Sequence, residues 1–515
     1  MPASQKIITK LRERRQIEAS LTKMLAAESE PDLRRQAAEI AGSGPQVIPA
    51  IIGSLDRADA QMLAAIGIVA ASLDHEEITA ALRQVILQPQ CTDRERVGAM
   101  TILQRFLGQP PDDDLLASLA DPESMVISSL EEVLGLAVRN TAVLIQYIES
   151  LDQQEPDVVL AVIRTLREMG TPAAGRAVRA VEPLRLMAQD VREEIAAEAL
   201  QALGAIRLPE AAQALQTLIP ASTLSLQPVA ERLLRKLRFA GVRVNPLPPP
   251  PPQWRALVSA VDGLGQQNVW FLQDHQQAGY ERFLNVLLSD RAGAVEAVGH
   301  MQVPSFMLPP QRSIGTIHDV ALPDGSGGML MLEASFSLGR RLVAEALARN
   351  RETQIPIAGP LRLLSPWLWG YSDAKSPSLP IMPQPSAEDR LLAGHLLHHP
   401  AFATWTVRSR TILQAAEEAL RYPGWDLEVW VKRLVGELFA DPYVAKVFHR
   451  RLATMSEWLL LTGDETACRL AQAAAESMLN TDLPGQPFVQ ALVRRDLQLA
   501  LHSLESTSEP VSGRE

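Results

Sequence analysis

Apolar residues in the first half of the chain recur at intervals of three and four, the periodicity of a helix with one buried face. In the stretch that ends at Gly170, this face consists of Val159, Ile163, Leu166 and Met169. Similar short patterns follow one another from about residue 28 to residue 244, and alanine is frequent in them. We therefore predict an array of closely packed helices, because such a helix pair cannot bury its apolar face alone.

Glycines close several of these helical patterns at regular intervals: Gly42, Gly108, Gly170, Gly204 and Gly241. Two of the intervals are about twice the others, and Asp74 and Asn140 lie near their midpoints. Asp and Asn are the non-glycine residues that best tolerate the left-handed conformation at a helix C-terminus. With these two included, the steps are 30 to 37 residues. The spacing predicts about seven helix pairs, each ended by a left-handed residue.

This arrangement resembles HEAT repeats, which are antiparallel helix pairs. The resemblance is carried by the glycine-ended helices and by acidic or proline helix starts such as "EPDLRR", "CTDRER" and "AQDVREE". The short period is similar to that of the bacterial short-HEAT class, which includes lyase-associated repeats. The resemblance covers about residues 28–244 and implies an α-α solenoid of about seven HEAT-like repeats, a fold that offers an extended surface to a protein partner.

Beyond residue 253 the apolar positions change to a period of two, which indicates strands. Three strands are predicted between Trp254 and Asp290, from "WRALVSAV", "NVWFLQ" and "RFLNVLL". We expect the next two stretches, "RAGAVEAVGHM" and "MLMLEASFSLGRRLVAEALARN", to be helices. This order predicts a central α+β domain over residues 253–372, with an antiparallel sheet and helices on one face.

Helical periodicity returns after residue 387. Six helical patterns follow, which predict an irregular C-terminal helical bundle over residues 388–505, with helix pairs similar to tetratricopeptide repeats near "LLLTGDETACRLAQAAA". The tail 506–515 is predicted to be disordered. The expected fold is therefore mainly α.

Two proline-rich stretches separate these parts. The polyproline stretch 245–252 is predicted to be a stiff linker of roughly 20 Å, although it could also be a docking peptide for a groove of the SH3 or WW type. It separates the solenoid, residues 1–244, from the central domain. Only three aromatic residues precede the stretch, and all eight tryptophans follow it, so we expect separate cores on its two sides. The second linker is predicted over residues 373–387.

Composition limits the partners and the compartment. The net charge is −11, and neither half carries the basic excess that phosphate-backbone binding requires, so nucleic acid is disfavoured as the main partner. Two distant cysteines, Cys91 and Cys468, permit neither a disulfide framework nor a four-cysteine zinc site. No apolar run is long enough for a membrane span, and the first residues lack the apolar core of a signal peptide. We predict a cytoplasmic protein without a cofactor.

Both ends of the predicted solenoid are basic. The second end carries Arg232, Arg235, Lys236 and Arg238. These residues are interpreted as the polar cap that a solenoid needs for solubility, or alternatively as a docking patch for an acidic partner.

The central domain contains scattered His and Asp residues that could form a general-base or metal site. They are Asp274, His275, His300, His318 and Asp319. Their spacing matches no catalytic signature, so we interpret the histidines as structural. The glycine-rich "LPDGSGG" could bind phosphate at a helix N-terminus, but it lacks the GK[ST] of a P-loop and is interpreted as a turn.

One dense group of histidines occurs in "HLLHHP": His395, His398 and His399. Their spacing can seat a transition metal on one helix face. They also directly precede Pro400, so the other interpretation is that they cap the last turn of a helix.

The aromatic residues Trp367, Trp369 and Tyr371 lie just before the second linker. They are expected to pack between the central and C-terminal domains, or to be exposed as an anchor for a partner. The sequence as a whole favours a non-catalytic protein-protein interaction scaffold or adaptor. The alternative is an enzyme or small-molecule sensor with its site in the central α+β domain.

Overall fold

The computed structural model describes residues 3–24, 30–44, 46–58, 60–88, 90–109, 130–131, 133–170, 177–275, 279–321, 328–372, 382–407, 409–422, 424–479 and 482–508. These residues are mostly helical, with one antiparallel sheet in the central region. The chain divides into two compact units, Met1–Leu136 and Ala137–Glu515. This division does not fall at the polyproline stretch, because residues 137–244 belong to the same unit as everything that follows them.

The first unit consists of helices around their own apolar core. They are α1 (Ala3–Met24), α2 (Glu30–Ala41), α3 (Val47–Ser54), η1 (Leu55–Arg57), α4 (Ala60–Ala70), α5 (His75–Leu87) and α6 (Asp93–Arg105). Alternate helices are in contact, α2 with α4 and α4 with α6 on one side, and α1 with α3 and α3 with α5 on the other. Ile51, Ile66, Ile78 and Ile102 are completely buried between them.

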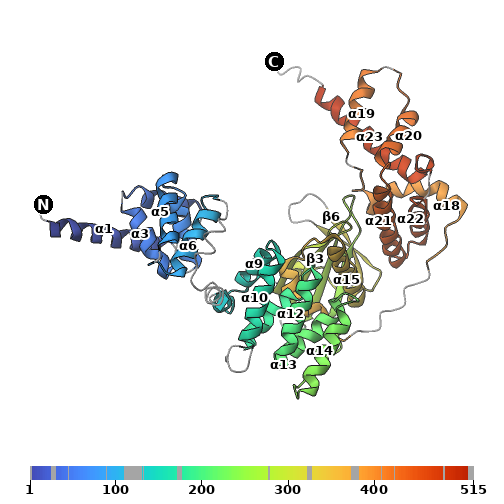
Figure 1. Cartoon of the computed structure of the whole chain (residues 1–515). Helices are drawn as coiled ribbons and strands as arrows, with labels where there is room; N and C mark the ends of the chain where they lie inside the picture. The colour runs from blue at the N-terminus through green and yellow to red at the C-terminus, as the bar shows by residue number, and fades with distance from the viewer. Residues whose placement is uncertain are drawn as a thin grey trace. The chain divides into compact units, whose positions relative to one another are not determined.

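The second unit begins with an array of helices, coloured teal to green in Figure 1. They are α9 (Thr141–Asp152), α10 (Pro156–Met169), α11 (Ala177–Met187), α12 (Glu193–Ala205), α13 (Pro209–Leu218), η3 (Ile219–Ala221) and α14 (Gln227–Phe239). α9, α11 and α13 are successive neighbours in one layer, and α10, α12 and α14 in the other. The apolar face expected in α10 is confirmed, since Val159, Ile163, Leu166 and Met169 are all buried.

Left-handed residues end fewer helices than expected. Gly108 and Gly241 have φ of 63° and 84°, as predicted. Gly170, the C-cap of α10, has φ of −72° and is therefore not left-handed. Gly204 lies inside α12, where a Cβ atom would come within 2.6 Å of the Leu233 side chain of α14. This glycine therefore permits the close approach of two helices rather than ending one.

Asp74 and Asn140 have a different role from the one predicted. The Asp74 side chain accepts hydrogen bonds from the backbone N–H groups of Glu76 and Glu77, and it is the N-cap of α5. The Asn140 side chain accepts from the N–H of Ala142 and is the N-cap of α9. Asp and Asn are among the most favoured N-cap residues, so they mark helix starts here.

The central sheet contains six strands in the part of the chain that the structure describes. They are β1 (Trp254–Ser259), β2 (Gln266–His275), β3 (Tyr280–Ser289), β4 (Gly293–Pro304), β5 (Ile317–Ala321) and β6 (Gly328–Ser335). Their order is β4-β3-β2-β1-β6-β5, and every neighbouring pair is antiparallel. The three predicted strands correspond to β1, β2 and β3.

Of the two helix predictions in this region, the first is wrong and the second is correct only for its later part. The stretch at 293–304 is strand β4, and a register shift opposite Leu287 and Leu288 leaves Val295 without a pairing partner. This bulge places the buried residues Ala294 and Ala297 three positions apart, which imitates helical spacing. The second stretch is strand β6 followed directly by helix α15 (Phe336–Thr353), and Ser335 between them caps the helix.

Helix α15 packs on one face of the sheet, as expected. Phe336 and Val343 of α15 share one core with Ala256, Phe271 and Val286 of the strands. The opposite face has a smaller apolar cluster around Leu257, Leu272 and Met331. Two short helices, α16 (Gly359–Leu364) and α17 (Pro366–Trp369), follow α15. α16 lies against β4, and α16 and α17 contact the helical layer that contains α9, α11 and α13.

The C-terminal helices agree with the six predicted patterns. They are α18 (Ala387–Leu392), η5 (Ala393–His398), η6 (Pro400–Phe402), α19 (Arg410–Arg421), α20 (Leu427–Leu438), α21 (Pro442–Leu461), α22 (Glu465–Ser477), η7 (Leu483–Gly485) and α23 (Pro487–Ser508). They share a core with the sheet. The indole N–H groups of Trp405 and Trp458 donate to the carbonyls of Val261 and Val258 at 2.9 and 3.0 Å.

The polyproline stretch differs from a free spacer. It is extended, but Gln216 Nε2 of α13 donates to the carbonyl of Asn245 at 3.0 Å, and the N–H of Ser372 donates to the carbonyl of Pro248 at 2.8 Å. Val191 and Ala221, which precede the stretch, belong to the same apolar core as the sheet. The stretch therefore runs between two parts that already touch each other.

Residues 373–381 of the second predicted linker and 509–515 of the predicted tail lie outside the described residues. α23 extends into the expected tail as far as Ser508. Within the described ranges, no helix combines the length and the hydropathy needed to cross a membrane.

Candidate functional site

A buried polar network joins the α9–α14 array to the segment around α16. Arg362 is 1% exposed, and its Nη2 donates to Asp152 Oδ2 of α9 at 2.9 Å. From α11, Arg185 donates to the carbonyl of Arg362 at 2.9 Å and to Ser365 Oγ at 2.7 Å. Burial raises the pKa of Asp152 to about 6, against the opposing effect of Arg362. The network fixes the helical array on the sheet, so its role is structural.

A second buried cluster lies on the sheet face opposite α15. His318 Nε2 is 2.8 Å from Glu333 Oε2, and Arg255 Nη1 donates to the same oxygen at 3.0 Å. Glu281 Oε2 is 3.7 Å from Arg255 Nη2, and desolvation raises the pKa of Glu281. Arg255 also donates to the carbonyl of Pro309 in the segment that crosses this face. These side chains are paired with one another, as in a structural ion cluster.

The His/Asp residues considered for catalysis are not brought together. His318 is buried against Glu333, whereas Asp319 is the next residue of β5, lies on the other face and is exposed. Asp274 and His275 lie at the end of β2, and the His275 side chain is outside the described residues. His300 is exposed on β4 and stacks on Phe283. Residues 322–327 of the "LPDGSGG" stretch are also outside the described residues.

The three clustered histidines do not converge on one point. His395 and His398 have ring centroids 6.1 Å apart on η5. His399 Nδ1 instead accepts from the N–H of Ala401, and its Nε2 lies 3.6 Å from Asp464 Oδ2. Among the described residues, no group of three or more His, Cys, Asp or Glu side chains could hold a metal ion.

The aromatic residues before the second linker are packed into the protein. Trp369 is buried with the Arg340 guanidinium over its ring at 5.0 Å, and Arg282 covers Trp367 at 4.9 Å. The Tyr371 hydroxyl accepts from the indole of Trp254 at 3.1 Å. These contacts are with the sheet and α15, so the three aromatics complete the central core rather than extending to a partner.

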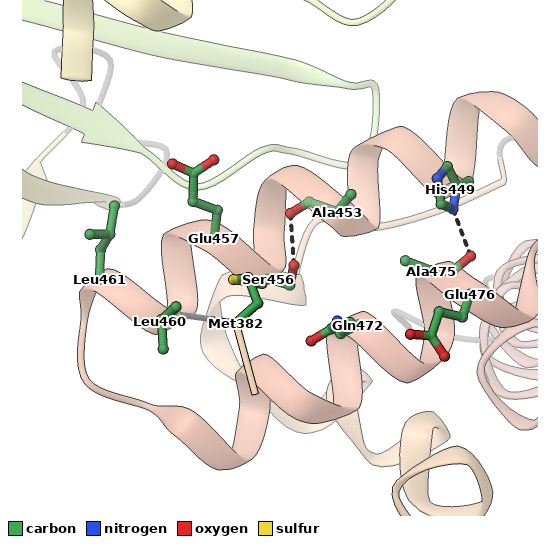
Figure 2. A pocket seen from close by; sticks show the side chains of 10 residues that line it. All are labelled: Met382, His449, Ala453, Ser456, Glu457, Leu460, Leu461, Gln472, Ala475 and Glu476. Atoms are coloured by element: carbon green, nitrogen blue, oxygen red, sulfur yellow. Dashed lines mark hydrogen bonds between the residues drawn. The ribbon is translucent and has the colours of Figure 1, made fainter. Parts of the chain in front are cut away.

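A cavity of about 340 Å³ lies between helices α21 and α22 (Figure 2). α21 contributes a stripe of residues spaced three and four apart, and α22 contributes a shorter stripe. The lining consists of Met382, His449, Ala453, Ser456, Glu457, Leu460, Leu461, Gln472, Ala475 and Glu476. Small side chains on both helices, among them Ala453, Ser456 and Ala475, leave this space open where larger residues would fill it.

Several polar groups of this cavity present hydrogen-bond acceptors. His449 Nδ1 lies 2.8 Å from the carbonyl of Ala475, which can only accept, so Nδ1 carries the hydrogen and Nε2 of the neutral ring is an acceptor. Gln472 Oε1 is buried and accepts no hydrogen bond from any described residue. Glu476 is paired with Arg390 at 3.2 Å, and both side chains are about half exposed. Glu457 points toward the strands in Figure 2 and is paired with Arg341.

A second cavity of about 330 Å³ adjoins the first, because His449 and Ala453 line both. It is bounded by the sheet, α15 and α21. In this cavity Arg451 is buried and paired with Asp290 at 2.9 Å, and Arg349 and Arg450 lie nearby. Burial raises the pKa of Asp290, and Arg451 opposes the increase. The two cavities therefore differ in charge as far as the described lining residues are concerned, since arginines line the second cavity and not the first.

Helix α14 carries an exposed basic face. Its buried residues are Ala230, Leu233, Leu234 and Leu237. The opposite side presents Arg232, Arg235, Lys236, Arg238 and Phe239, and Phe239 is 92% exposed. Among the described residues, none of these four cations forms an ion pair. The face is therefore open to a partner.

No family model matches this chain, and no curated protein and no solved structure matches it either. The basic residues of α14 can be identified from the sequence, whereas the cavity between α21 and α22 was not predicted. The signal for the cavity is the set of small residues that face each other from two helices, Ala453 and Ser456 on α21 and Ala475 on α22.

Proposed function

We propose that the protein is a non-catalytic protein-protein interaction scaffold or adaptor that binds an acidic segment of a partner through α14. One observation carries the proposal: the exposed basic face of α14 has no ion-pair partners among the described residues and ends in an almost fully exposed phenylalanine. The alternating contacts of α9–α14 support the HEAT-like solenoid interpretation of this part of the chain.

The spacing of the residues on α14 favours one extended contact. Arg232, Arg235, Lys236 and Phe239 are separated by three and four positions, so they lie on one side of the helix. Three unpaired cations attract an acidic segment, and the aromatic ring supplies the apolar contact that commonly dominates a protein interface. Arg238 adds charge beside this row.

The fixed position of the array also supports a scaffold. The buried bonds of Arg185 and Arg362 hold α9 and α11 against α16, so binding at α14 would not require ordering the array relative to the sheet. Preorganisation of this kind reduces the entropic cost of association. The alternative catalytic function is less well supported, because His318 and Asp319 lie on opposite faces of β5.

The proposal can be tested with the full-length tagged protein in a lysate of the source cells. We expect a set of acidic proteins to be retained at low salt and released as salt is raised, because screening weakens surface attraction. The double variant Arg235→Glu/Lys236→Glu should lose them. Phe239→Ala should weaken retention without changing its dependence on salt.

A matched control reverses two charges elsewhere. Lys432 on α20 and Lys446 on α21 are also exposed and have no ion-pair partner among the described residues. The variant Lys432→Glu/Lys446→Glu changes the net charge by the same amount and should retain the partners. Retention of the same proteins by the α14 double variant, or no specific retention by the unaltered protein, would refute the proposal.

A further inference from the structure

The cavity between α21 and α22 combines an apolar wall with polar groups of one kind. Met382, Leu460, Leu461 and the two alanines Ala453 and Ala475 form the apolar part. We propose that this cavity is a binding site for a small organic ammonium ion, an amine attached to an apolar body. The site is separate from α14 and does not depend on the function proposed for that helix.

The unpartnered oxygen of Gln472 identifies the polar part of the ligand. Gln472 Oε1 is buried in the wall, and a buried acceptor without a partner carries the cost of lost hydration. A ligand that donates a hydrogen bond to this oxygen would remove that cost. Figure 2 shows the Gln472 carboxamide directed toward Met382, at the centre of the lining residues.

His449 and Glu476 add to the same preference. The His449 ring is oriented by its bond to the Ala475 carbonyl, which leaves Nε2 of the neutral ring as an acceptor. The side chains of Glu476 and Arg390 are both about half exposed, and exposed ion pairs contribute little to stability. The Glu476 carboxylate can therefore still accept a hydrogen bond from a ligand. Among the described residues that line this cavity there is no Lys or Arg.

These features select against an anion. A carboxylate or phosphate would face Gln472 Oε1 and the Glu476 carboxylate, and among the described lining side chains only the amide nitrogen of Gln472 could offer it a donor that is not already bonded. An ammonium group has three donors and a positive charge, and it matches several acceptors at once. The adjoining cavity contains Arg349, Arg450 and Arg451, so an anionic compound would favour that side instead.

The volume limits the size of the ligand. At about 340 Å³ the cavity is at the lower end of the range for small-molecule sites. Each water molecule occupies roughly 30 Å³ in the liquid, so the cavity has space for about ten non-hydrogen atoms. 3-Phenylpropylamine has this size, and 3-phenyl-1-propanol and 3-phenylpropionate are neutral and anionic compounds of similar shape.

Isothermal titration of the full-length protein with these three compounds tests the proposal. We expect the amine to bind at least about tenfold more tightly than the carboxylate, with the alcohol between them. Gln472→Leu keeps the size of the side chain and removes the acceptor, so the affinity for the amine should fall about three- to tenfold, the effect of one lost hydrogen bond. The affinity for the alcohol should also fall.

A blocking variant locates the site together with Gln472→Leu, because Ala453 lines both cavities whereas Gln472 lines the first and not the second. Ala453 is exposed at the edge of the cavity, so Ala453→Trp should fill the opening without disturbing the core and should abolish binding of the amine. Ala161 is an exposed alanine in the middle of α10, and Ala161→Trp should bind the amine as the unaltered protein does. Absence of amine binding, equal binding of the carboxylate, or equal binding by the two Trp variants would overturn the proposal.

Discussion

Replacement of Arg362 with Met tests whether the buried network holds the α9–α14 array on the sheet. The guanidinium donates to Asp152 Oδ2 at 2.9 Å and to the carbonyl of Ile357 at 3.0 Å. Met has a similar length but no charge, so the apolar packing is largely kept. The Asp152 carboxylate, which is 6% exposed, then loses its paired cation.

The size of the effect follows from this burial. Removing one member of a buried ion pair costs about 3–5 kcal/mol, because the remaining charge is left in a poorly solvated position. Domains are stable by about 5–15 kcal/mol, so the second unit should lose a large part of its stability. The double variant Asp152→Asn/Arg362→Met leaves no buried charge at this pair and should recover about 1–3 kcal/mol of the loss.

Urea unfolding followed by tryptophan fluorescence measures the change. All eight tryptophans lie after residue 253, so the signal reports on the sheet and the C-terminal helices. A loss in Arg362→Met of less than about 1 kcal/mol at pH 8 would contradict the reasoning. The reasoning would also be contradicted if the stability lost in the double variant equalled the sum of the losses in Asp152→Asn and Arg362→Met, because the two side chains would then not be energetically coupled.

Three further predictions concern other contacts. Burial raises the pKa of Asp152 to about 6, above its value in the unfolded chain. The protonated Asp152 carboxyl therefore favours the folded state below pH 4, and this stabilisation declines by about 3 kcal/mol as the pH rises through 6. Asp152→Asn should remove this part of the pH dependence of urea unfolding. The Asn350 side chain bonds to both backbone groups of Ala294 on the edge strand β4, at 2.7 and 3.2 Å. Asn350→Ala should cost about 2–4 kcal/mol and accelerate hydrogen exchange in β4, and unchanged exchange there would contradict this role. A Cβ atom at Gly263 would lie 1.9 Å from the carbonyl oxygen of Thr404, so Gly263→Ala should destabilise the contact between sheet and C-terminal helices by about 1–3 kcal/mol, seen as faster proteolysis than in the unaltered protein.

Local periodicity was sufficient to predict most of the helices and the first three strands. It failed at β4, where the bulge at Val295 gives a strand the apolar spacing of a helix. It also merged β6 with α15, because the chain passes from strand to helix with no turn between them. Ser335, whose hydroxyl accepts from the N–H of Leu338, was the available sign of this boundary.

Contacts between distant segments could not be predicted from the sequence. Arg185 is separated by more than 170 positions from Arg362 and Ser365, to which it donates hydrogen bonds, and nothing local to either segment indicates their pairing. The aromatic content suggested separate cores, but Val191 and Ala221 belong to the core of the sheet. The spacing of Asp74 and Asn140 did locate helix ends, but it could not distinguish a start from a stop.

In the hydrogen bonds between the α9–α14 array and the rest of the second unit, the donors and the acceptors belong to different kinds of group. Arg185, Arg351 and Gln354 donate from their side chains, whereas many of the acceptors are main-chain carbonyls, such as those of Arg362 and Ala221. A carbonyl is present whatever side chain the residue carries. As copies of this gene diverge, the bond from Arg185 to the carbonyl of Leu363 therefore places no restriction on the Leu363 side chain, whereas Arg185 can be replaced only at the expense of the junction.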